Sequence, residues 1–134
     1  MIDMAVTLSP VTRDLVDAPN FAVLATTNPD GSPQTSVVWV TRDGDDLLFS
    51  TLRDRAKALN LSRDPRASAS ILSGADPQVY AEVRGTVTIT EDVGRRLAND
   101  LSHKYDGRDF PEDRPGQQRV VLRLTPTRVT GSAA

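Results

Sequence analysis

Residues 21–51 read FAVLATTNPDGSPQTSVVWVTRDGDDLLFST, and this part of the chain already indicates a class of fold. Its three apolar runs are separated by Asn28-Pro29-Asp30-Gly31 and by Asp43-Gly44, residue types that favour tight turns. The pattern predicts strands over 21–28, 33–41 and 46–51, joined by hairpins. We therefore expect an antiparallel meander.

The flanking sequence continues this mainly β pattern with short helices between the strands. Helices are expected after Ser9-Pro10, over 53–64 and after Thr90, where Thr90 has the residue type of an N-cap. Further strands are expected over 66–73, over 79–90 with a bulge or sharp bend at Gly85, and over 118–132 as one or two strands broken at Pro126. Six or seven short antiparallel strands predict a small β-barrel, and 134 residues predict a single domain over 1–134.

Composition excludes several kinds of function. The net charge of −2 gives no reason to expect nucleic acid or an anionic membrane as a partner. The chain has no Cys and a single His, His103, so we expect no metal site. No targeting signal or membrane span is recognisable, and we expect a cytoplasmic protein; two lysines among many arginines are typical of a GC-rich genome.

Common catalytic motifs do not occur in the sequence. There is no GxGxxG, GxxxxGK[ST] or GxSxG pattern. His103 falls in the last turn of a predicted helix, where a cation complements the helix dipole without any role in catalysis. A polar loop rich in Pro and Gly is expected over 106–117.

The segment from Ser50 to Lys57 is the most promising site. The stretch 53–66, which overlaps it, carries five cations against two anions, a local charge of +3: Arg53, Arg55, Lys57, Arg63 and Arg66 against Asp54 and Asp64. The hydroxyls of Ser50 and Thr51 end a strand that leads into a helix N-terminus, where unpaired N–H groups favour an anion. The pattern predicts a phosphate site, although a solvated helix face with paired charges would have the same composition.

Two aromatic residues and two polar residues are candidates for contacts with a flat ring. Trp39 and Tyr80 would either pack in a core or dimer interface or form a wall of a ring pocket. Gln34 and Ser36 alternate with the neighbours of Trp39 along the strand, and their side chains could read a ring edge or meet solvent.

Four stretches in this order resemble the pyridoxamine 5′-phosphate oxidase-like family, in particular its actinobacterial branch that uses the deazaflavin coenzyme F420. They are FAVLATTNPDGSPQTSVVWV, LLFSTLRDRAKALNLSRDPRASASIL, YAEVRGTVTI and RVVLRLTPTRVTG. The resemblance implies a six-stranded antiparallel split β-barrel of the FMN-binding type. It also implies a homodimer with cofactor sites at the subunit interface.

The resemblance also assigns residues to the cofactor. It implies that Ser50, Thr51, Arg55, Ala56 and Lys57 hold the phosphate, that the segment Gln34 to Trp39 of the partner covers the ring, and that Tyr80 lies near the pocket. Arg119 is a weaker candidate for contacts with a phosphate or tail. The longer anionic F420 would also favour cations such as Arg53, Arg63 and Arg66.

The activity implied is an F420-dependent oxidoreductase that transfers hydride to a small, electron-poor, unsaturated substrate. The alternatives are an FMN-binding oxidoreductase of the same fold, a non-enzymatic carrier of flavin or deazaflavin, and a pure interaction module anchored by Trp39. The chain ends in TRVTGSAA without the extra basic and His residues of enzymes that oxidise pyridoxamine phosphate, which argues against pyridoxal phosphate synthesis.

Overall fold

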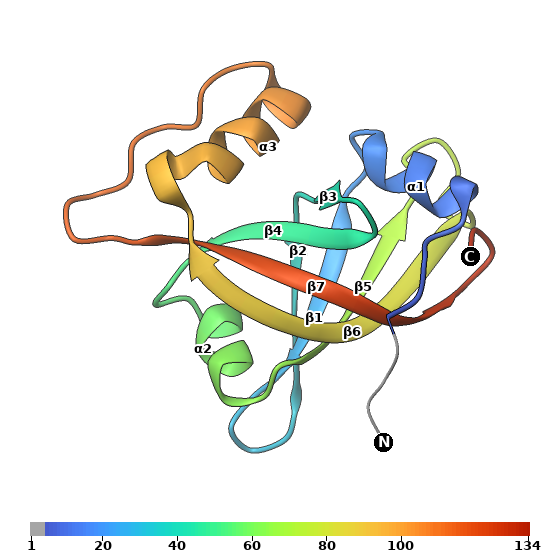
Figure 1. The fold of residues 1–134 in the computed structure, drawn as a ribbon, viewed down its shortest axis with the longest axis horizontal. Coiled ribbons are helices and arrows are strands. Elements are labelled where there is room, and N and C mark those ends of the chain that lie inside the picture. Colours follow the sequence, from blue (N-terminus) through green and yellow to red (C-terminus); the bar gives the residue numbers. More distant parts are fainter. Residues whose placement is uncertain (1–4) are drawn as a thin grey trace.

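A computed structural model describes residues 5–134 and contains one curved antiparallel sheet with short helices at its margins (Figure 1). The helices are α1 (Pro10–Asp17), α2 (Ala56–Arg63) and α3 (Arg96–Asp106), and a 3₁₀ turn, η1 (Val93–Arg95), precedes α3. The strands are β1 (Ala22–Thr27), β2 (Pro33–Val38), β3 (Thr41–Asp43), β4 (Asp46–Leu52), β5 (Arg66–Leu72), β6 (Tyr80–Glu91) and β7 (Arg119–Thr130).

The strands follow the order β2-β1-β5-β6-β7-β4-β3 in the sheet, and every neighbouring pair is antiparallel. The edge strands β2 and β3 do not pair with each other, and Trp39 and Val40 alone connect them along the chain. This gap makes the barrel a split one, so the predicted fold class is confirmed. The sheet has seven strands and not the six that the resemblance implies, because the run 33–41 breaks at Trp39 and its end pairs with β4 as the short β3.

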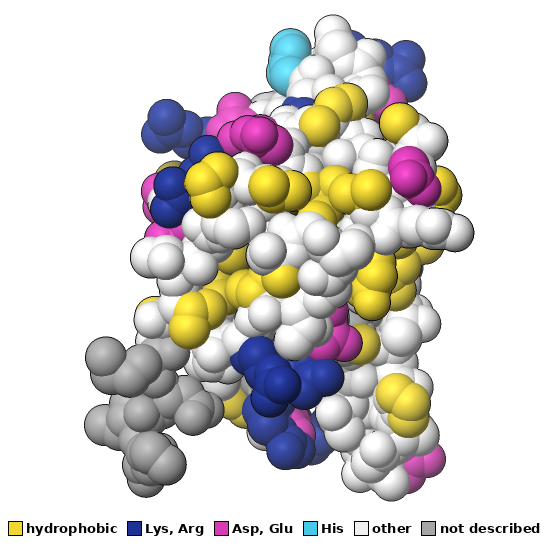
Figure 2. All heavy atoms as spheres, turned by 90° about the vertical axis from the view of Figure 1, so that its right-hand side faces the viewer, with side chains coloured by type: hydrophobic (Ala, Val, Ile, Leu, Met, Phe, Trp, Pro, Cys, Tyr) yellow, Lys and Arg dark blue, Asp and Glu magenta, His cyan; other side chains and the backbone are white. Residues whose placement is uncertain are grey.

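The core lies on the inner face of the curved sheet, where alternate residues of the strands are buried, as the period of two requires. Its largest fully buried side chains include Leu24, Leu47, Phe49, Ile71 and Leu122. Helix α1 covers one end of this core with Leu15 and Val16. On the face that carries α1 and the C-terminus, hydrophobic side chains lie scattered among polar ones, and Lys and Arg side chains gather near its lower centre (Figure 2).

The predicted bulge at Gly85 is confirmed. The register between β6 and β7 shifts between Arg84 and Gly85, which pairs with Pro126. A Cβ added at Gly85 would lie 2.0 Å from the carbonyl oxygen of Thr125, so the two backbones approach too closely for any other residue. β7 runs through Pro126 as one continuous strand, since the proline falls at this irregular point of the ladder.

The predicted N-cap at Thr90 is wrong. β6 continues to Glu91, and η1 intervenes before α3. The carboxylate of Asp92 caps α3, accepting hydrogen bonds from the backbone N–H groups of Leu97 at 2.9 Å and Ala98 at 3.0 Å. By contrast, the predicted N-cap of α1 is confirmed, because Ser9 Oγ accepts a hydrogen bond from the Thr12 N–H.

Candidate functional site

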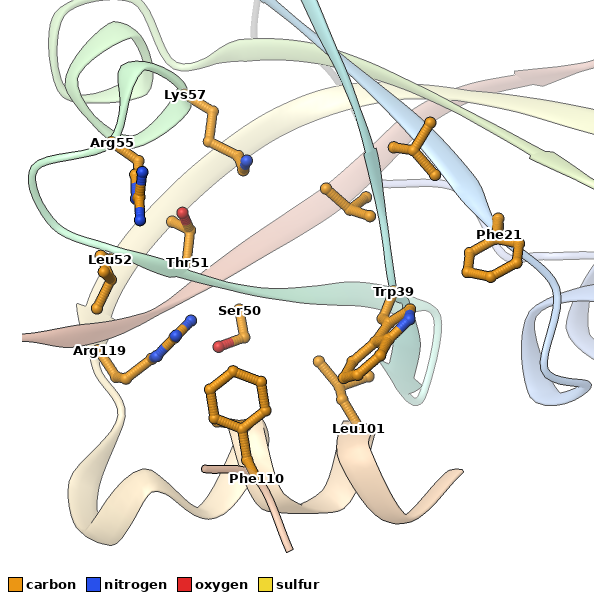
Figure 3. A pocket seen from close by; sticks show the side chains of 13 residues that line it. Phe21, Trp39, Ser50, Thr51, Leu52, Arg55, Lys57, Leu101, Phe110 and Arg119 are labelled. Carbon is orange, nitrogen blue, oxygen red and sulfur yellow. The ribbon is translucent and has the colours of Figure 1, made fainter. Parts of the chain in front are cut away.

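A pocket of about 380 Å³ lies between β4, the end of β2, α3 and the loop 107–118 (Figure 3). Its size is in the range of sites for small molecules and cofactors. One end is polar and the other is mostly apolar. The pocket is lined by Phe21, Val37, Val38, Trp39, Ser50, Thr51, Leu52, Arg55, Lys57, Ala98, Leu101, Phe110 and Arg119.

The polar end is built where β4 passes into α2. Ser50 and Thr51 are held by the ladder between β4 and β7, in which they pair with Val121 and Val120. The chain then turns at Leu52–Arg55, and Arg55 occupies the N-cap position of α2 without any side-chain hydrogen bond to the helix. The backbone N–H groups of the first turn of α2 therefore lack the usual capping acceptor.

Three side chains at this end lack partners in the part of the chain that the structure describes. The hydroxyl oxygen of Ser50 is buried without a hydrogen bond. Neither Arg55 nor Lys57 takes part in a salt bridge or side-chain hydrogen bond among residues 5–134. Burial lowers the pKa of Lys57 from its usual 10.5, and the positive charge of Arg55 lowers it further. An anion here would restore the favourable environment of both cations.

The apolar end is formed by an aromatic wall and by α3. The ring of Trp39 is stacked on Tyr105, with centroids 5.2 Å apart and planes at 7°. Phe110 meets Trp39 edge to face at 6.4 Å. Figure 3 shows Trp39 and Phe110 on two sides of this end, with Leu101 of α3 nearby. Such surfaces suit a flat aromatic ring system.

Phe110 belongs to the loop 107–118, which ionic contacts tie to the rest of the molecule. Its N–H donates to Asn99 Oδ1 at 3.0 Å, and Arg119 lies 4.5 Å from the centre of its ring. Arg119 also pairs with Asp113 at 3.0 Å, and Arg95 reaches Asp113 at 3.2 Å. These two arginines, the hydrogen bond from Arg119 above all, hold the pKa of Asp113 below its usual range.

The structure brings together most of the expected phosphate-site residues. Ser50, Thr51, Arg55 and Lys57 line the pocket, and Trp39 lines its other end. Ala56 is the first residue of α2, where its N–H is one of the uncapped groups, but its side chain does not line the pocket.

Three other candidates lie elsewhere in this chain. Gln34 and Ser36 are on β2 but do not line the pocket; Gln34 Oε1 accepts from Thr26 Oγ1 at 2.6 Å, and Ser36 Oγ is buried without a partner. Tyr80 begins the twelve-residue strand β6, whose opposite end at Glu91 is the one next to the pocket.

The arginines expected along a longer anionic ligand have other contacts. Arg66 pairs with Asp64 at 2.8 Å, Arg53 donates to Gln118 Oε1 at 2.9 Å, and Arg63 donates to the Thr27 carbonyl. None of the three lines the pocket. Arg119 does line it, although its guanidinium is already paired with Asp113.

Four pocket residues were not among the site candidates from the sequence: Phe21, Ala98, Leu101 and Phe110. Ala98 and Leu101 lie on the buried side of α3. The apolar periodicity of a helix does not distinguish a core residue from one that also lines a pocket. Phe110 is the one large aromatic residue in an otherwise polar loop, and that contrast could have marked it.

The polar end of the pocket thus fits an anion such as a phosphate, and the apolar end fits a flat ring. An uncapped helix N-terminus, two cations, an unpaired hydroxyl and an aromatic wall are the elements of a nucleotide-like cofactor site. No helix in the described range 5–134 combines the length and apolar character that crossing a membrane requires.

The fold is a split β-barrel, and sequence comparison identifies the family. Residues 8–133 match the family model of pyridoxamine 5′-phosphate oxidase, and the chain belongs to this family. Among solved structures, it is similar to an F420 reductase, with 29% identity, a TM-score of 0.81 and coverage of 92% of this chain and 98% of the reductase.

Two further structures show the breadth of the similarity. A conserved hypothetical protein from Mycobacterium tuberculosis shares 25% identity, with a TM-score of 0.74 and coverage of 96% of this chain and 86% of the other. An FMN-binding protein related to pyridoxamine 5′-phosphate oxidase, from Nostoc punctiforme, shares 20% identity, with a TM-score of 0.59 and coverage of 81% and 71%. This last likeness concerns the fold alone.

Proposed function

We propose that this protein is an oxidoreductase that binds coenzyme F420 and transfers hydride to a small, electron-poor, unsaturated substrate. The observation that carries the proposal is the uncapped N-terminus of α2 beside the unpaired Ser50, Arg55 and Lys57, which opens into a pocket with an aromatic wall. The phosphodiester would take the polar end and the deazaflavin ring the end near Trp39.

Each part of the pocket has a defined task in this proposal. Lys57 and Arg55 neutralise the phosphate charge, and the first N–H groups of α2 with the hydroxyls of Ser50 and Thr51 donate hydrogen bonds to its oxygens. The apolar side chains of Val38, Ala98 and Leu101 keep water from the ring. The bound deazaflavin supplies the hydride, and the protein supplies position and surroundings.

The proton that completes the reduction would come from solvent. The pocket lining contains no carboxylate, His or Tyr, and its ionisable side chains are Arg55, Lys57 and Arg119. These cations are engaged with the phosphate or with Asp113 in the proposed complex. Tyr80 lies at the other end of β6 and does not line the pocket.

The choice of F420 over FMN rests on the similarity to the F420 reductase, which is higher in identity and covers more of both chains than that to the FMN-binding protein. Both cofactors carry a phosphate and a flat ring, so the same residues would hold either. FMN is therefore the alternative cofactor, and the binding experiment must distinguish it from F420.

We also propose a homodimer that completes the site. Two apolar side chains at the pocket, Phe21 and Val37, are 53% and 68% exposed, and Val37 lies on the edge strand β2. A second copy seated there would cover the open side of the pocket and bury both residues. Gln34 and Ser36, which miss the pocket of their own chain, would then serve the site of the partner.

Titration of the purified protein with F420 and with FMN, followed by cofactor fluorescence, tests the proposal. We expect F420 to bind more tightly, and Lys57→Glu to weaken binding about tenfold or more. Arg66→Glu is the matched control, because it makes the same charge change outside the pocket and should leave affinity unchanged. Tighter binding of FMN would assign the alternative cofactor, and no binding of either would refute the proposal.

Sedimentation of a Val37→Asp variant tests the dimer. A charge on the exposed edge strand should yield monomers and weaken F420 binding. Val93→Asp, at a 76% exposed position away from the pocket, should change neither property. A wild-type protein that sediments as a monomer at micromolar concentration would contradict the dimer.

A further inference from the structure

The two residues that bridge the split of the barrel, Trp39 and Val40, belong to no strand. A connector of this kind cannot rely on a sheet ladder to satisfy its backbone polar groups. Both polar groups of Val40 are instead bound by side chains from the last turn of α3. Its N–H donates to the hydroxyl of Tyr105 at 3.2 Å, and its carbonyl accepts from Lys104 Nζ at 2.6 Å.

Lys104 joins this connector to α1. Its Nζ also donates to the Val16 carbonyl at 2.5 Å, so one ammonium group binds two carbonyls that lie 24 positions apart in sequence (40 minus 16). The ammonium is half-buried, and burial lowers its pKa to about 8, with the nearby carboxylate of Asp17 acting in the opposite direction. Burying half of a cation costs hydration free energy, and the two hydrogen bonds of Lys104 to backbone carbonyls compensate for that cost.

Tyr105 completes the attachment and contacts the pocket wall directly. Its hydroxyl donates to the Asn20 carbonyl, in the connection between α1 and β1. Its ring is stacked on Trp39 at 5.2 Å, and Phe21 lies 5.8 Å away on the side of the pocket rim. Lys104 and Tyr105 thus hold Trp39 through the stacked Tyr105 ring and through hydrogen bonds to Val40, the residue that follows it, while Phe110 contacts the edge of the pocket wall.

We propose that Lys104 and Tyr105 are positioning residues that hold Trp39 as the aromatic wall for the ring of the bound cofactor. They act on the ring end of the pocket and not on the phosphate end, since neither residue lines the pocket and neither contacts Ser50, Arg55 or Lys57. The inference rests on the proposed function for the identity of the ring, but the position of Trp39 can be measured without any cofactor.

The experiment uses the full chain, with Trp39 as its single tryptophan and therefore its only indole fluorophore. Lys104→Met keeps the length of the side chain and removes the donors, Lys104→Arg restores charge and donors, and Tyr105→Phe removes only the hydroxyl. Arg96→Met is the control, because it removes one cation from an exposed position of the same helix. Acrylamide quenching of Trp39 is measured first.

Binding is then measured with two probes that separate the ends of the site: the deazaflavin chromophore lacking its phosphate, and inorganic phosphate. Lys104→Met and Tyr105→Phe should increase quenching of Trp39 and weaken binding of the chromophore about tenfold. Binding of phosphate should stay within about twofold of the wild type. Lys104→Arg should recover wild-type quenching and binding, and Arg96→Met should match the wild type throughout.

Two results would overturn the inference. If Lys104→Met unfolds at a lower temperature but keeps wild-type quenching and chromophore affinity, Lys104 merely stabilises the fold. If chromophore and phosphate binding fall equally, the variant has lost the whole site. Should the wild type bind no flavin or deazaflavin, the proposed function fails, and unchanged Trp39 quenching in Lys104→Met and Tyr105→Phe would still refute the positioning role. Tyr105→Phe serves as the test if Lys104→Met does not fold.

Discussion

Asp113 accepts hydrogen bonds from both Nε and Nη2 of Arg119, at 3.1 and 3.0 Å, and this pair joins the loop 107–118 to the first residue of β7. The two side chains are only 12% and 15% exposed, so water competes little for the contact. Arg119 also faces the ring of Phe110. The place of Phe110 at the pocket therefore depends on this carboxylate as well as on the hydrogen bond from its own N–H to Asn99.

Asp113→Asn should loosen this loop. Loss of the charged acceptor leaves Arg119 and Arg95 with weaker partners, at a cost of about 2 kcal/mol. Limited proteolysis should cut within residues 107–118 faster than in the wild type. Asp109→Asn is the control, because its carboxylate is 86% exposed and pairs only with His103. Equal cleavage rates in the two variants would contradict the role of Asp113.

The same contact predicts that the free energy of unfolding changes with pH in the acidic range. The pKa of Asp113 is lowered in the fold, so its stabilisation is fully present above the ordinary value of 3.8 and is lost as the pH falls through the lower folded pKa. The stability difference between wild type and Asp113→Asn, measured by urea unfolding, should therefore be largest near neutral pH and shrink below pH 3.8. A difference that persists unchanged in acid would exclude the charge as its cause.

Lys57 predicts a dependence on alkaline pH. Burial and Arg55 lower its pKa below 10.5, so the lysine begins to lose its proton at a lower pH than an exposed one. Binding of F420 should begin to weaken at a pH below the ordinary lysine value of 10.5, and less so in Lys57→Arg, whose guanidinium keeps its proton. Identical pH profiles for the two proteins would place the phosphate away from Lys57.

Gly85→Ala should destabilise the barrel. Its Cβ would lie 2.0 Å from a backbone oxygen of β7, which cannot move without breaking the ladder, and the expected cost is about 3 kcal/mol. Gly74→Ala is the control, since the nearest atom to its Cβ is the Asn20 side chain at 3.7 Å. Thermal unfolding of both variants measures the difference, and equal melting temperatures would contradict the expected clash.

Asp92→Ala should weaken α3. Asp92 is buried and accepts from two N–H groups at the start of the helix, so its removal should cost about 1–2 kcal/mol in chemical denaturation. Thr90→Ala changes the residue that the sequence favoured as the cap, which the structure places in β6, and should have a smaller effect. The reverse order of effects would reinstate Thr90 as the cap.

The hairpins and the bulge could be predicted because their signals are local. Turn residues at 28–31 and 43–44 determine where the chain reverses, and a lone glycine in a long strand marks a close backbone approach. The end of β2 at Val38 could not be predicted in this way. Trp39 and Val40 continue the apolar pattern of the strand, and what ends it is the change of sheet edge, which depends on distant partners.

The candidate site was likewise predictable where its residues are close in sequence and less predictable where they are distant. Its polar end was predictable because Ser50, Thr51, Arg55 and Lys57 lie within one short segment, where a strand passes into a helix. Its apolar end was predictable only at Trp39, because Leu101 and Phe110 come from separate segments that only the tertiary fold brings to it. Tyr80 was a candidate that the fold places elsewhere. Its strand reaches the pocket at one end, and Tyr80 lies at the other end.

The connector at Trp39 and Val40 also has a consequence for how the chain folds. Its attachments reach across 64 and 65 residues to Lys104 and Tyr105, and Lys104 reaches across 88 residues to Val16. Closing such long loops costs conformational entropy, and the local contacts that form early in folding do not compensate for that cost. The aromatic end of the pocket therefore depends on contacts between distant segments, and chains that lack these contacts present no formed ring site. A cofactor that needs both ends would bind only the finished barrel and stabilise it against unfolding, by an amount that grows with the logarithm of the cofactor concentration once this exceeds the Kd.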